Sequence, residues 1–518
     1  MDNSLKIQFA LTQKWIEPKD AVVFGVFQGE EIPCGLGFKK ETAEKEAVQL
    51  FPVFSKIKKY LALKDFSAEF GKIATLYPED ALYKRVIVCG LGKKEELDAE
   101  KLRQTAALAV AALEAMGTAR ASFTLFGAPS QSAQDRLTAI FEGAALALYK
   151  FDPYKKGKED APARISDVEF LLPEILSPEQ VDALKKEELR DLVVAEAVYF
   201  ARNITNQPAS VVTPKFLVQT AQALAKQFPE TVSFRAFGKK ELGDLNMNGI
   251  LAVGGGSNNE PALIVLEYKP VSAQESAPSV ALVGKGVCFD SGGISLKPSE
   301  NMDEMKMDMA GAAAVMAAFF AAARLGVSVP LACVIPAVEN LPGSTAYRPG
   351  DIIKSASGKT IEVLNTDAEG RVILADALHF AASQLKPAYL IDLATLTGAC
   401  VAALGSHYAA VLGTDDELVR SLTEAGIKTG EKLWALPLDD VYKKQIESDI
   451  ADVKNIGGKT AGVITAALFL KEFVGGHNKY AHIDIAGTAM LSEKQGYKPK
   501  GGSGFGVRLL VEFLENIR

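Results

Sequence analysis

The stretch that decides the fold is Val280-Ala-Leu-Val-Gly-Lys285-Gly-Val-Cys-Phe-Asp290-Ser-Gly-Gly293. The apolar run Val280–Val283 predicts a buried strand, and the glycines after it predict a turn. In open α/β sheets, ligands bind outside the carboxyl ends of the strands. We therefore expect Lys285 and Asp290 to lie at a ligand-binding edge of a sheet.

Strands and helices are expected to alternate along the rest of the chain, which is typical of an α/β protein. The predicted strands are Arg85–Cys89, Ser122–Phe126, Val168–Leu172, Ile250–Val253, Ala262–Glu267, Val280–Val283, Leu331–Ile335, Ala388–Asp392 and Ala481–Ile485. The predicted helices are Asp98–Met116, Ser132–Tyr149, Ser177–Ile204, Gly311–Leu325 and Arg371–Gln384, and a charged loop is expected over Lys155–Arg164.

The length of 518 residues is too great for one ordinary core, and we expect two domains. A long helix is predicted to begin at Ser177, because Ser177 and Gln180 can form a capping box and Pro178 suits the first helical position. This helix either connects the two domains or packs wholly within one of them. We favour the connector, with an N-terminal α/β domain over 1–176, a connecting helix over 177–205 and a catalytic domain over 206–518.

Composition argues against several classes of protein. A net charge of −7 does not favour nucleic-acid binding, which needs clustered positive charge. The longest apolar run, Ala312–Ala323, is shorter than the roughly 20 residues of a membrane span, so a buried helix and no membrane association are expected. Residues 1–13 lack the pattern of a signal peptide. The five scattered cysteines are expected to be reduced and buried, which fits the cytoplasm.

Common catalytic motifs are absent from the sequence. It contains no His-Glu-x-x-His of a zincin protease and no Gly-x-Ser-x-Gly of a nucleophile elbow. The glycine clusters at 90–92, 254–256 and 284–286 complete neither a dinucleotide fingerprint nor a phosphate loop. The four histidines are dispersed and are expected to be structural.

Four carboxylates stand in glycine-rich or apolar sequence, where an unpaired charge is costly. They are Asp290, Asp308, Asp367 and Glu369. Asp367 and Glu369 are two residues apart, so in extended backbone they would point to the same side. Two divalent cations would balance four negative charges, as in two-metal hydrolases. Three of these carboxylates also have simpler interpretations: Asp308 as a helix N-cap, and Asp367 and Glu369 as partners of a helix dipole. The nearby lysines Lys285 and Lys297 could likewise be solvated loop residues.

Several motifs in the same order resemble the leucyl aminopeptidase family, also called cytosol aminopeptidases. The signature is Asn365-Thr-Asp-Ala-Glu-Gly-Arg371. The others are Asn206-Gln-Pro-Ala-Ser210, Gly284-Lys-Gly286, Phe289-Asp-Ser-Gly-Gly293, Lys297-Pro-Ser299, Met305-Lys-Met-Asp-Met-Ala-Gly-Ala-Ala-Ala-Val315, Ala394-Thr-Leu-Thr-Gly398, Ala461-Gly-Val-Ile-Thr-Ala-Ala467 and His482-Ile-Asp-Ile-Ala-Gly487. The resemblance covers roughly residues 200–518.

The resemblance implies a two-domain α/β protein with a smaller N-terminal domain and a larger C-terminal metallopeptidase domain, whose mixed sheet lies between helices. It implies a cytoplasmic homohexamer that releases leucine and other amino acids from peptides with a free N-terminus, through a metal-bridged water. Two divalent ions per subunit, zinc or manganese with magnesium as an alternative, would be held by Lys285, Asp290, Asp308, Asp367 and Glu369.

The resemblance also implies the division of roles around the two ions. Asp290 and Glu369 would bridge them, Asp367 would complete one site, and Lys285 and Asp308 would complete the other, where the substrate amine binds. A ligating Lys285 must be neutral, so its pKa would have to be lowered by the metal and by burial. The catalytic residues would be Lys297, which stabilises the oxyanion, and Arg371, which holds a bicarbonate ion as general base. The first side chain of the substrate would be bound by Met305, Thr395, Leu396 and Gly398.

Two alternatives stay open at this point. A dinuclear phosphoesterase would need basic residues around the metals, and Lys297 and Arg371 are available for that role. A non-catalytic homologue that binds metal or a partner would be expected to have a broken ligand set, whereas every family ligand is present here.

Overall fold

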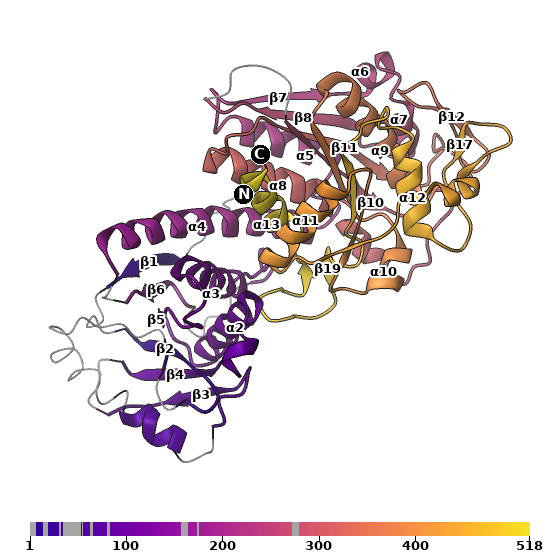
Figure 1. The fold of residues 1–518 in the computed structure, drawn as a ribbon. Coiled ribbons are helices and arrows are strands. Elements are labelled where there is room, and N and C mark those ends of the chain that lie inside the picture. Colours follow the sequence, from indigo (N-terminus) through magenta and orange to yellow (C-terminus); the bar gives the residue numbers. More distant parts are fainter. Residues whose placement is uncertain are drawn as a thin grey trace. The chain divides into compact units, whose positions relative to one another are not determined.

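The computed structural model describes residues 7–13, 19–30, 33–34, 53, 55–62, 66–79, 83–156, 164–173, 176–271 and 279–517. The chain divides into two compact units (Figure 1). Unit 1 comprises residues 1–196 and 494–499, and unit 2 comprises residues 197–493 and 500–518. Most of the loop expected over Lys155–Arg164 lies outside the described residues.

Unit 1 is built on a six-stranded sheet in the order β1-β6-β5-β2-β4-β3. All neighbouring strands are parallel except β3 and β4. The strands are β1 (Gln8–Thr12), β2 (Ala21–Val26), β3 (Ile73–Leu76), β4 (Arg85–Gly90), β5 (Arg120–Thr124) and β6 (Asp167–Leu171), with a short helical turn η1 (Lys94–Glu96) and helices α2 (Ala99–Ala115) and α3 (Ala133–Ala147). The three strands and two helices predicted for this part of the chain are confirmed.

The long helix α4 (Pro178–Asn206) begins as its sequence predicts. The Ser177 backbone N–H donates to Gln180 Oε1 at 2.9 Å, and the Gln180 N–H donates to Ser177 Oγ at 3.3 Å, which is the reciprocal capping box. The boundary between the two units falls inside this helix, between Glu196 and Ala197.

Unit 2 contains a nine-stranded sheet in which eight strands run in the order β16-β15-β18-β14-β9-β11-β8-β7 and β10 pairs with β11. The sheet is mixed, as expected, because β7, β8 and β15 each have an antiparallel neighbour. Its strands are β7 (Val232–Phe237), β8 (Ala262–Tyr268), β9 (Val280–Gly284), β10 (Gly286–Asp290), β11 (Leu331–Asn340), β14 (Tyr389–Ala394), β15 (Ala409–Gly413), β16 (Leu433–Ala435) and β18 (Tyr480–Asp484).

Helices and small sheets complete unit 2. The helices are α5 (Pro214–Ala225), α6 (Lys239–Asp244), α7 (Asn248–Gly254), α8 (Ala310–Leu325), α9 (Glu369–Phe380), α10 (Gly398–Leu404), α11 (Asp416–Thr429), α12 (Gly462–Lys471) and α13 (Val507–Asn516), with short helical turns η2 (Met302–Met307), η3 (Ala381–Leu385) and η4 (Asp440–Ile446). The short strands are β12 (Ile352–Lys354), β13 (Thr360–Glu362), β17 (Val453–Lys454), β19 (Met490–Leu491) and β20 (Gly501–Gly502).

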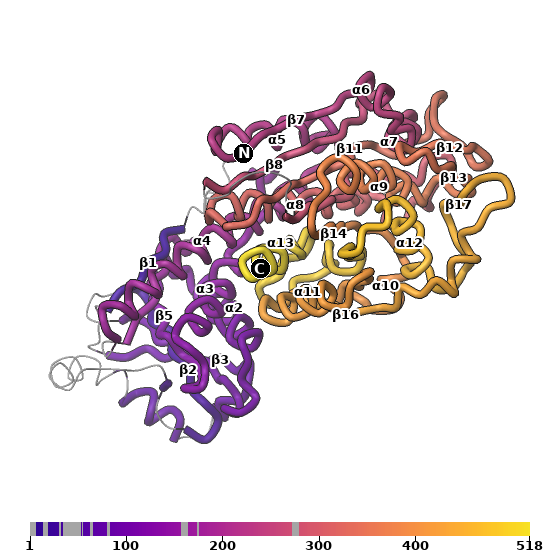
Figure 2. Tube along the Cα trace, turned by 45° about the horizontal axis from the view of Figure 1, so that its top comes forward, coloured from indigo at the N-terminus to yellow at the C-terminus, as the bar shows by residue number. Residues whose placement is uncertain are grey.

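Helices cover both faces of the large sheet. The side chains of Ala281 and Val283 belong to the same core cluster as the buried residues of α9 and α12. The next residue of β9, Gly284, points the other way, and a Cβ there would meet Val315 of α8. Figures 1 and 2 both show α13 beside α8 and α11.

The burial of the apolar helix and of most cysteines agrees with the sequence. The segment Met302–Leu325 is long and apolar enough to cross a membrane, but 83% of its apolar window is buried inside the structure. The buried helix predicted from Ala312–Ala323 is therefore confirmed. All five cysteines are free, and four of them are buried; the expectation of burial is wrong for Cys34, which is partly exposed.

The strand predicted over Ile250–Val253 is wrong, because these residues lie in α7. Ile250 and Val253, three residues apart, are buried, whereas Leu251 and Ala252 are only partly so. That is the one-sided burial of a helix. A run of four apolar residues is too short for its periodicity to distinguish the two structures.

Four strands of the large sheet end at the same edge. β9 runs parallel to β11 and β14, and β14 runs parallel to β18. The residues at or directly after their carboxyl ends are Lys285, Asn340, Thr395 and Asp484. The edge expected to carry Lys285 is therefore the edge where three other polar residues also stand.

Close packing of α8 against this edge predicts a cost for substituting Gly311. A Cβ there would collide with the backbone oxygen of Leu393 and would also approach the backbone nitrogen of Lys285. We therefore expect Gly311→Ala to lower the free energy of unfolding of unit 2 by about 1–3 kcal/mol. Urea unfolding measures this change. Gly243→Ala, whose Cβ would meet nothing within 4 Å, is the matched control and should be neutral or slightly stabilising. Equal stability of the two variants would contradict the packing argument.

Candidate metal centre

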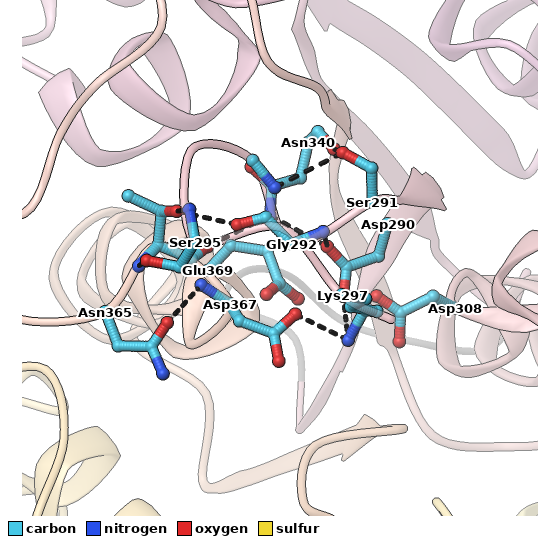
Figure 3. Close-up of polar contacts among 12 residues, drawn as sticks. Asp290, Ser291, Gly292, Ser295, Lys297, Asp308, Asn340, Asn365, Asp367 and Glu369 are labelled. Atoms are coloured by element: carbon cyan, nitrogen blue, oxygen red, sulfur yellow. Dashed lines mark hydrogen bonds and ion pairs between the residues drawn. The ribbon is translucent and has the colours of Figure 1, made fainter. Parts of the chain in front are cut away.

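The carboxylates singled out in the sequence converge at the carboxyl edge of the large sheet (Figure 3). Asp290 ends β10, and Glu369 is the first residue of α9. Ligand oxygens of Asp290, Asp367 and Glu369 all lie within 4.8 Å of one another. Asp290 and Glu369 are 2% and 1% exposed, so most of this charge is removed from water.

Asp308 is held inside the same cluster by Lys285. The Lys285 ammonium lies 2.7 Å from Asp308 Oδ1 and 2.8 Å from Glu369 Oε1. Asp308 does not cap α8, since the N-cap position is Met309 and carries no side-chain hydrogen bond. The simpler interpretation of Asp308 as an N-cap is therefore wrong. Capping of a helix does not explain why the Asp308 carboxylate is buried.

Asp367 and Glu369 are brought together by a turn and not by extended backbone. Asp367 lies in a turn, its N–H accepted by Asn365 Oδ1 at 2.9 Å, and α9 begins two residues later. The expected convergence is found, but the geometric reason given for it was wrong.

Lys297 also lies against these carboxylates. Its ammonium is 2.8 Å from Asp290 Oδ2 and 2.6 Å from Asp367 Oδ1 (Figure 3). The Lys297 side chain is 21% exposed, whereas that of Lys285 is 4% exposed. Solvent or a substrate can thus reach Lys297, whereas Lys285 is enclosed.

Negative charge exceeds positive charge in the cluster, because two ammonium groups offset only half of four carboxylates. Burial raises the pKa of Asp308 well above its ordinary value despite the neighbouring Lys285. Burial and the charge of Glu369 raise the pKa of Asp290, and burial also raises that of Asp367. Burial is the largest cause of all three shifts, and additional positive charge in the site would oppose each of them.

Lys285 has a different pKa from the one that metal ligation would require. Burial alone would lower its pKa, but the carboxylates of Asp308, Glu369 and Asp290 outweigh burial and raise it. The expected lowering is therefore not produced by the chain itself. It would need additional cations that compete for the same carboxylates.

Two oxygens in the cluster have the properties of open ligands. Asp308 Oδ2 and Glu369 Oε2 are buried and have no hydrogen-bond partner among the described residues. A buried acceptor without a partner costs about 1–3 kcal/mol. Clustered carboxylate oxygens are ligands suited to divalent cations such as magnesium, manganese and zinc. The residues present therefore fit a divalent metal centre.

Arg371, two residues after Glu369, is a buried cation. It is 7% exposed, and within the described part of the chain its guanidinium makes no hydrogen bond or ion pair; its Nε is buried and unpartnered. Burial lowers its pKa to about 10. A buried guanidinium with unused donors fits a small planar anion.

The four residues expected to bind the side chain of the substrate's first residue differ in how directly they contact the carboxylate cluster. Thr395 donates from Oγ1 to Asp308 Oδ1 at 2.7 Å and accepts from Lys285 Nζ at 2.8 Å through its backbone oxygen. Leu396 follows on the same loop, and exposed Gly398 begins α10. Met305 is half-buried in η2, three residues before Asp308.

Sequence reasoning did not single out Asp484 as a residue of this site, although it stands in a quoted motif. The carboxylate is fully buried at the end of β18. It accepts from the Leu396 N–H at 3.1 Å and from Thr397 Oγ1 at 2.7 Å. Asp484 therefore holds the loop between β14 and α10 next to the carboxylate cluster. Asn340 was missed as well, because an asparagine in a strand gives no signal without its neighbours.

A carboxylate cluster with adjacent lysines at this edge of a mixed α/β sheet fits the divalent metal centre that metal-dependent hydrolases use. Residues 199–511 match the catalytic domain of the cytosol aminopeptidase family, and residues 24–158 match the N-terminal domain of that family. The chain belongs to the cytosol aminopeptidase family.

Individual relatives agree with this assignment. The chain is 45% identical over 465 residues to a probable cytosol aminopeptidase of Geotalea uraniireducens, covering 88% of this chain and 90% of the relative. It is 48% identical over 433 residues to one of Syntrophotalea carbinolica, covering 83% and 85%. A solved structure of the bottromycin maturation enzyme BotP in complex with Mn is similar with a TM-score of 0.81 and 32% identity, covering 96% of this chain and 99% of that one.

The chain is thus a metal-dependent aminopeptidase, a peptide hydrolase that acts at the N-terminus of its substrates. Neither alternative left open by the sequence is supported. The phosphoesterase reading conflicts with the family, and the residues that a non-catalytic homologue would be expected to lose lie together in the structure.

The contacts of Asp484 predict a variant that alters substrate binding. In Asp484→Asn the side chain can no longer accept hydrogen bonds at both of its terminal atoms, so the loop that carries Leu396 should become less well held. We expect KM to rise about 10-fold, because a hydrogen bond to a charged group contributes about 1.5–3 kcal/mol. Steady-state kinetics on a leucyl peptide measures this. Asp415→Asn, the same substitution at the N-cap of α11 in the same unit, is the control with unchanged KM. Unchanged KM in Asp484→Asn would refute the role of the loop contact.

Proposed function

We propose that catalysis is carried by the carboxylate cluster, its two lysines and Arg371. The observation that supports this most is the convergence of Asp290, Asp367 and Glu369 within 4.8 Å beside the unpartnered oxygens of Asp308 and Glu369. Asp290 and Glu369 would contact both of two divalent cations, Asp367 would complete one site, and Lys285 and Asp308 the other. Such ions supply Lewis acidity toward the scissile carbonyl and lower the pKa of a water nucleophile.

Lys297 is proposed to stabilise the oxyanion that develops on the scissile carbonyl. Its partial exposure supports contact with a substrate, and its charge gains most when the carbonyl oxygen becomes negative. Two cations that bind Asp290 and Asp367 would compete with Lys297 for their oxygens, which would release the ammonium toward the substrate.

The substrate's free amine is proposed to bind on the Asp308 side of the centre. Thr395 links Asp308 directly to the loop that carries Leu396 and Gly398, so the amine and the first side chain would be recognised by neighbouring groups. Met305 is assigned to the same pocket from the family resemblance. Substrates would be peptides that begin with leucine or with other residues.

Arg371 is proposed to hold a small anion, with bicarbonate as the candidate general base. The support is its burial with no partner among the described residues. A bound anion next to the cluster would accept a proton from the nucleophilic water, a task for which the described residues offer no histidine in the carboxylate group.

The identity of the metals, the assembly and the location are also proposals. Manganese is supported by the similar BotP structure in complex with Mn, and zinc or magnesium are the alternatives. Assembly as a homohexamer rests on family resemblance, and a cytoplasmic location rests on relatives named cytosol aminopeptidases. The segment 177–205 is proposed to connect the domains, which is supported by the unit boundary inside α4.

Recognition of a free amine predicts that blocking the N-terminus will abolish turnover. We expect an N-acetylated leucyl peptide to be cleaved at least 100-fold more slowly than its free counterpart, because a bound amine aligns the peptide for attack and orientation alone can contribute several kcal/mol. Liquid chromatography of both digests measures the two rates. Similar rates would contradict binding of the amine beside Asp308.

The two lysines are expected to differ when each is replaced by methionine, which keeps most of the stem volume. Lys297→Met should lower kcat by about 10²–10³ with near-normal metal content, because it removes one oxyanion donor. Lys285→Met should instead lower metal content, because Lys285 is proposed to complete one of the two metal sites. Elemental analysis and kcat are measured on both variants. Wild-type kcat in Lys297→Met, or equal loss of metal in both variants, would show that these roles are wrongly assigned.

A further inference from the structure

Asn340 lies beside the carboxylate cluster at the end of β11, where it is the strand partner of Asp290. It is fully buried. Its Nδ2 donates to Asp290 Oδ1 at 2.8 Å and to the backbone oxygen of Thr366 at 3.0 Å. The amide nitrogen of Asn340 therefore donates one hydrogen to each of the two chain segments that carry the proposed metal ligands.

The first of these bonds determines which oxygen of Asp290 can face a cation. Asp290 Oδ1 accepts from Asn340 Nδ2 and also from the Gly292 N–H at 2.9 Å. Among the described residues, Asp290 Oδ2 contacts the Lys297 ammonium at 2.8 Å and accepts no other hydrogen bond. Cations that enter the cluster thus find Oδ2 available and Oδ1 already hydrogen-bonded on both lone pairs.

The second bond fixes the loop before α9. The Thr366 backbone oxygen accepts from Asn340 and from Tyr347 Oη at 2.7 Å. Thr366 Oγ1 donates to the Gly292 backbone oxygen at 2.6 Å. Since Thr366 precedes Asp367, these bonds set the position of Asp367 relative to the turn that follows Asp290.

The amide of Asn340 is oriented by these two acceptors alone. Its own Oδ1 is buried without a partner among the described residues. Exchanging the oxygen and the nitrogen would set the amide oxygen against Asp290 Oδ1 and the Thr366 oxygen, which is repulsive. An aspartate or an apolar side chain of the same size could not supply both hydrogens.

We propose that Asn340 is a positioning residue for the metal centre: by occupying Asp290 Oδ1 it leaves Oδ2 as the oxygen that would hold metal, and it fixes the distance between the two ligand-bearing segments. This inference rests on the proposed function. Asn340 touches no substrate and acts only through Asp290 and Thr366. Groups that orient metal ligands typically contribute about 10–100-fold in metal affinity.

The test is titration of the metal-free full-length protein with Mn²⁺, followed by electron paramagnetic resonance, with thermal unfolding as a check of the fold. Wild-type protein should bind a pair of ions and show the signal of two exchange-coupled manganese ions. Asn340→Leu and Asn340→Asp should unfold near the wild-type temperature but bind the second ion at least about 10-fold more weakly and lose the coupled signal. The control is Asn248→Leu, which removes an amide of the same kind that donates to the Lys354 backbone oxygen; it should keep the coupled signal.

Each other outcome overturns the inference. Wild-type affinities and an unchanged coupled signal in both Asn340 variants would show that the amide does not position Asp290. Loss of the coupled signal in Asn248→Leu, or loss of the fold in both Asn340 variants, would show that general packing is responsible. Failure of wild-type protein to bind a pair of ions would instead overturn the proposed metal centre itself, and only this outcome does so.

Discussion

The constraint on which the site of unit 2 depends is the concentration of four carboxylates at one edge of the large sheet, three of them buried. Asp290, Asp308 and Glu369 are each less than 5% exposed, and two lysines cannot neutralise the charge. Repulsion between buried like charges amounts to several kcal/mol, so the arrangement is stable only with further positive charge or with protons. Burial is the main cause that raises the pKa values of Asp290 and Asp308, and additional positive charge nearby would lower them.

The sheet explains how charges so distant in sequence meet. Parallel strands bring their carboxyl ends to one edge, and β9, β11, β14 and β18 each place a polar residue there. The glycine-rich turn after β10 and the turn before α9 then fold over this edge and are fastened to each other through Thr366. Strands hold Lys285 and Asn340, and hydrogen-bonded turns hold Lys297 and Asp367.

The sequence predicted the parts of this arrangement that depend on local pattern. The apolar run before Lys285 identified the strand edge, and the capping residues at Ser177 identified the start of α4. It failed for Ile250–Val253, where four apolar residues fit a strand or a helix equally well. It gave the right neighbours but the wrong geometry for Asp367 and Glu369. Asn340 and Asp484 could not be recognised at all, since their importance comes from partners between 26 and 88 residues away.

The most direct measurement of the central claim is an anomalous-scattering map from crystals of the protein grown with Mn²⁺. Two peaks per chain are expected, both in contact with Asp290 and Glu369, one also with Asp367 and the other with Lys285 and Asp308. A single peak per chain would contradict the claim that the cluster holds two cations. So would a map with no peak among these carboxylates that shows manganese bound at other places in the crystal.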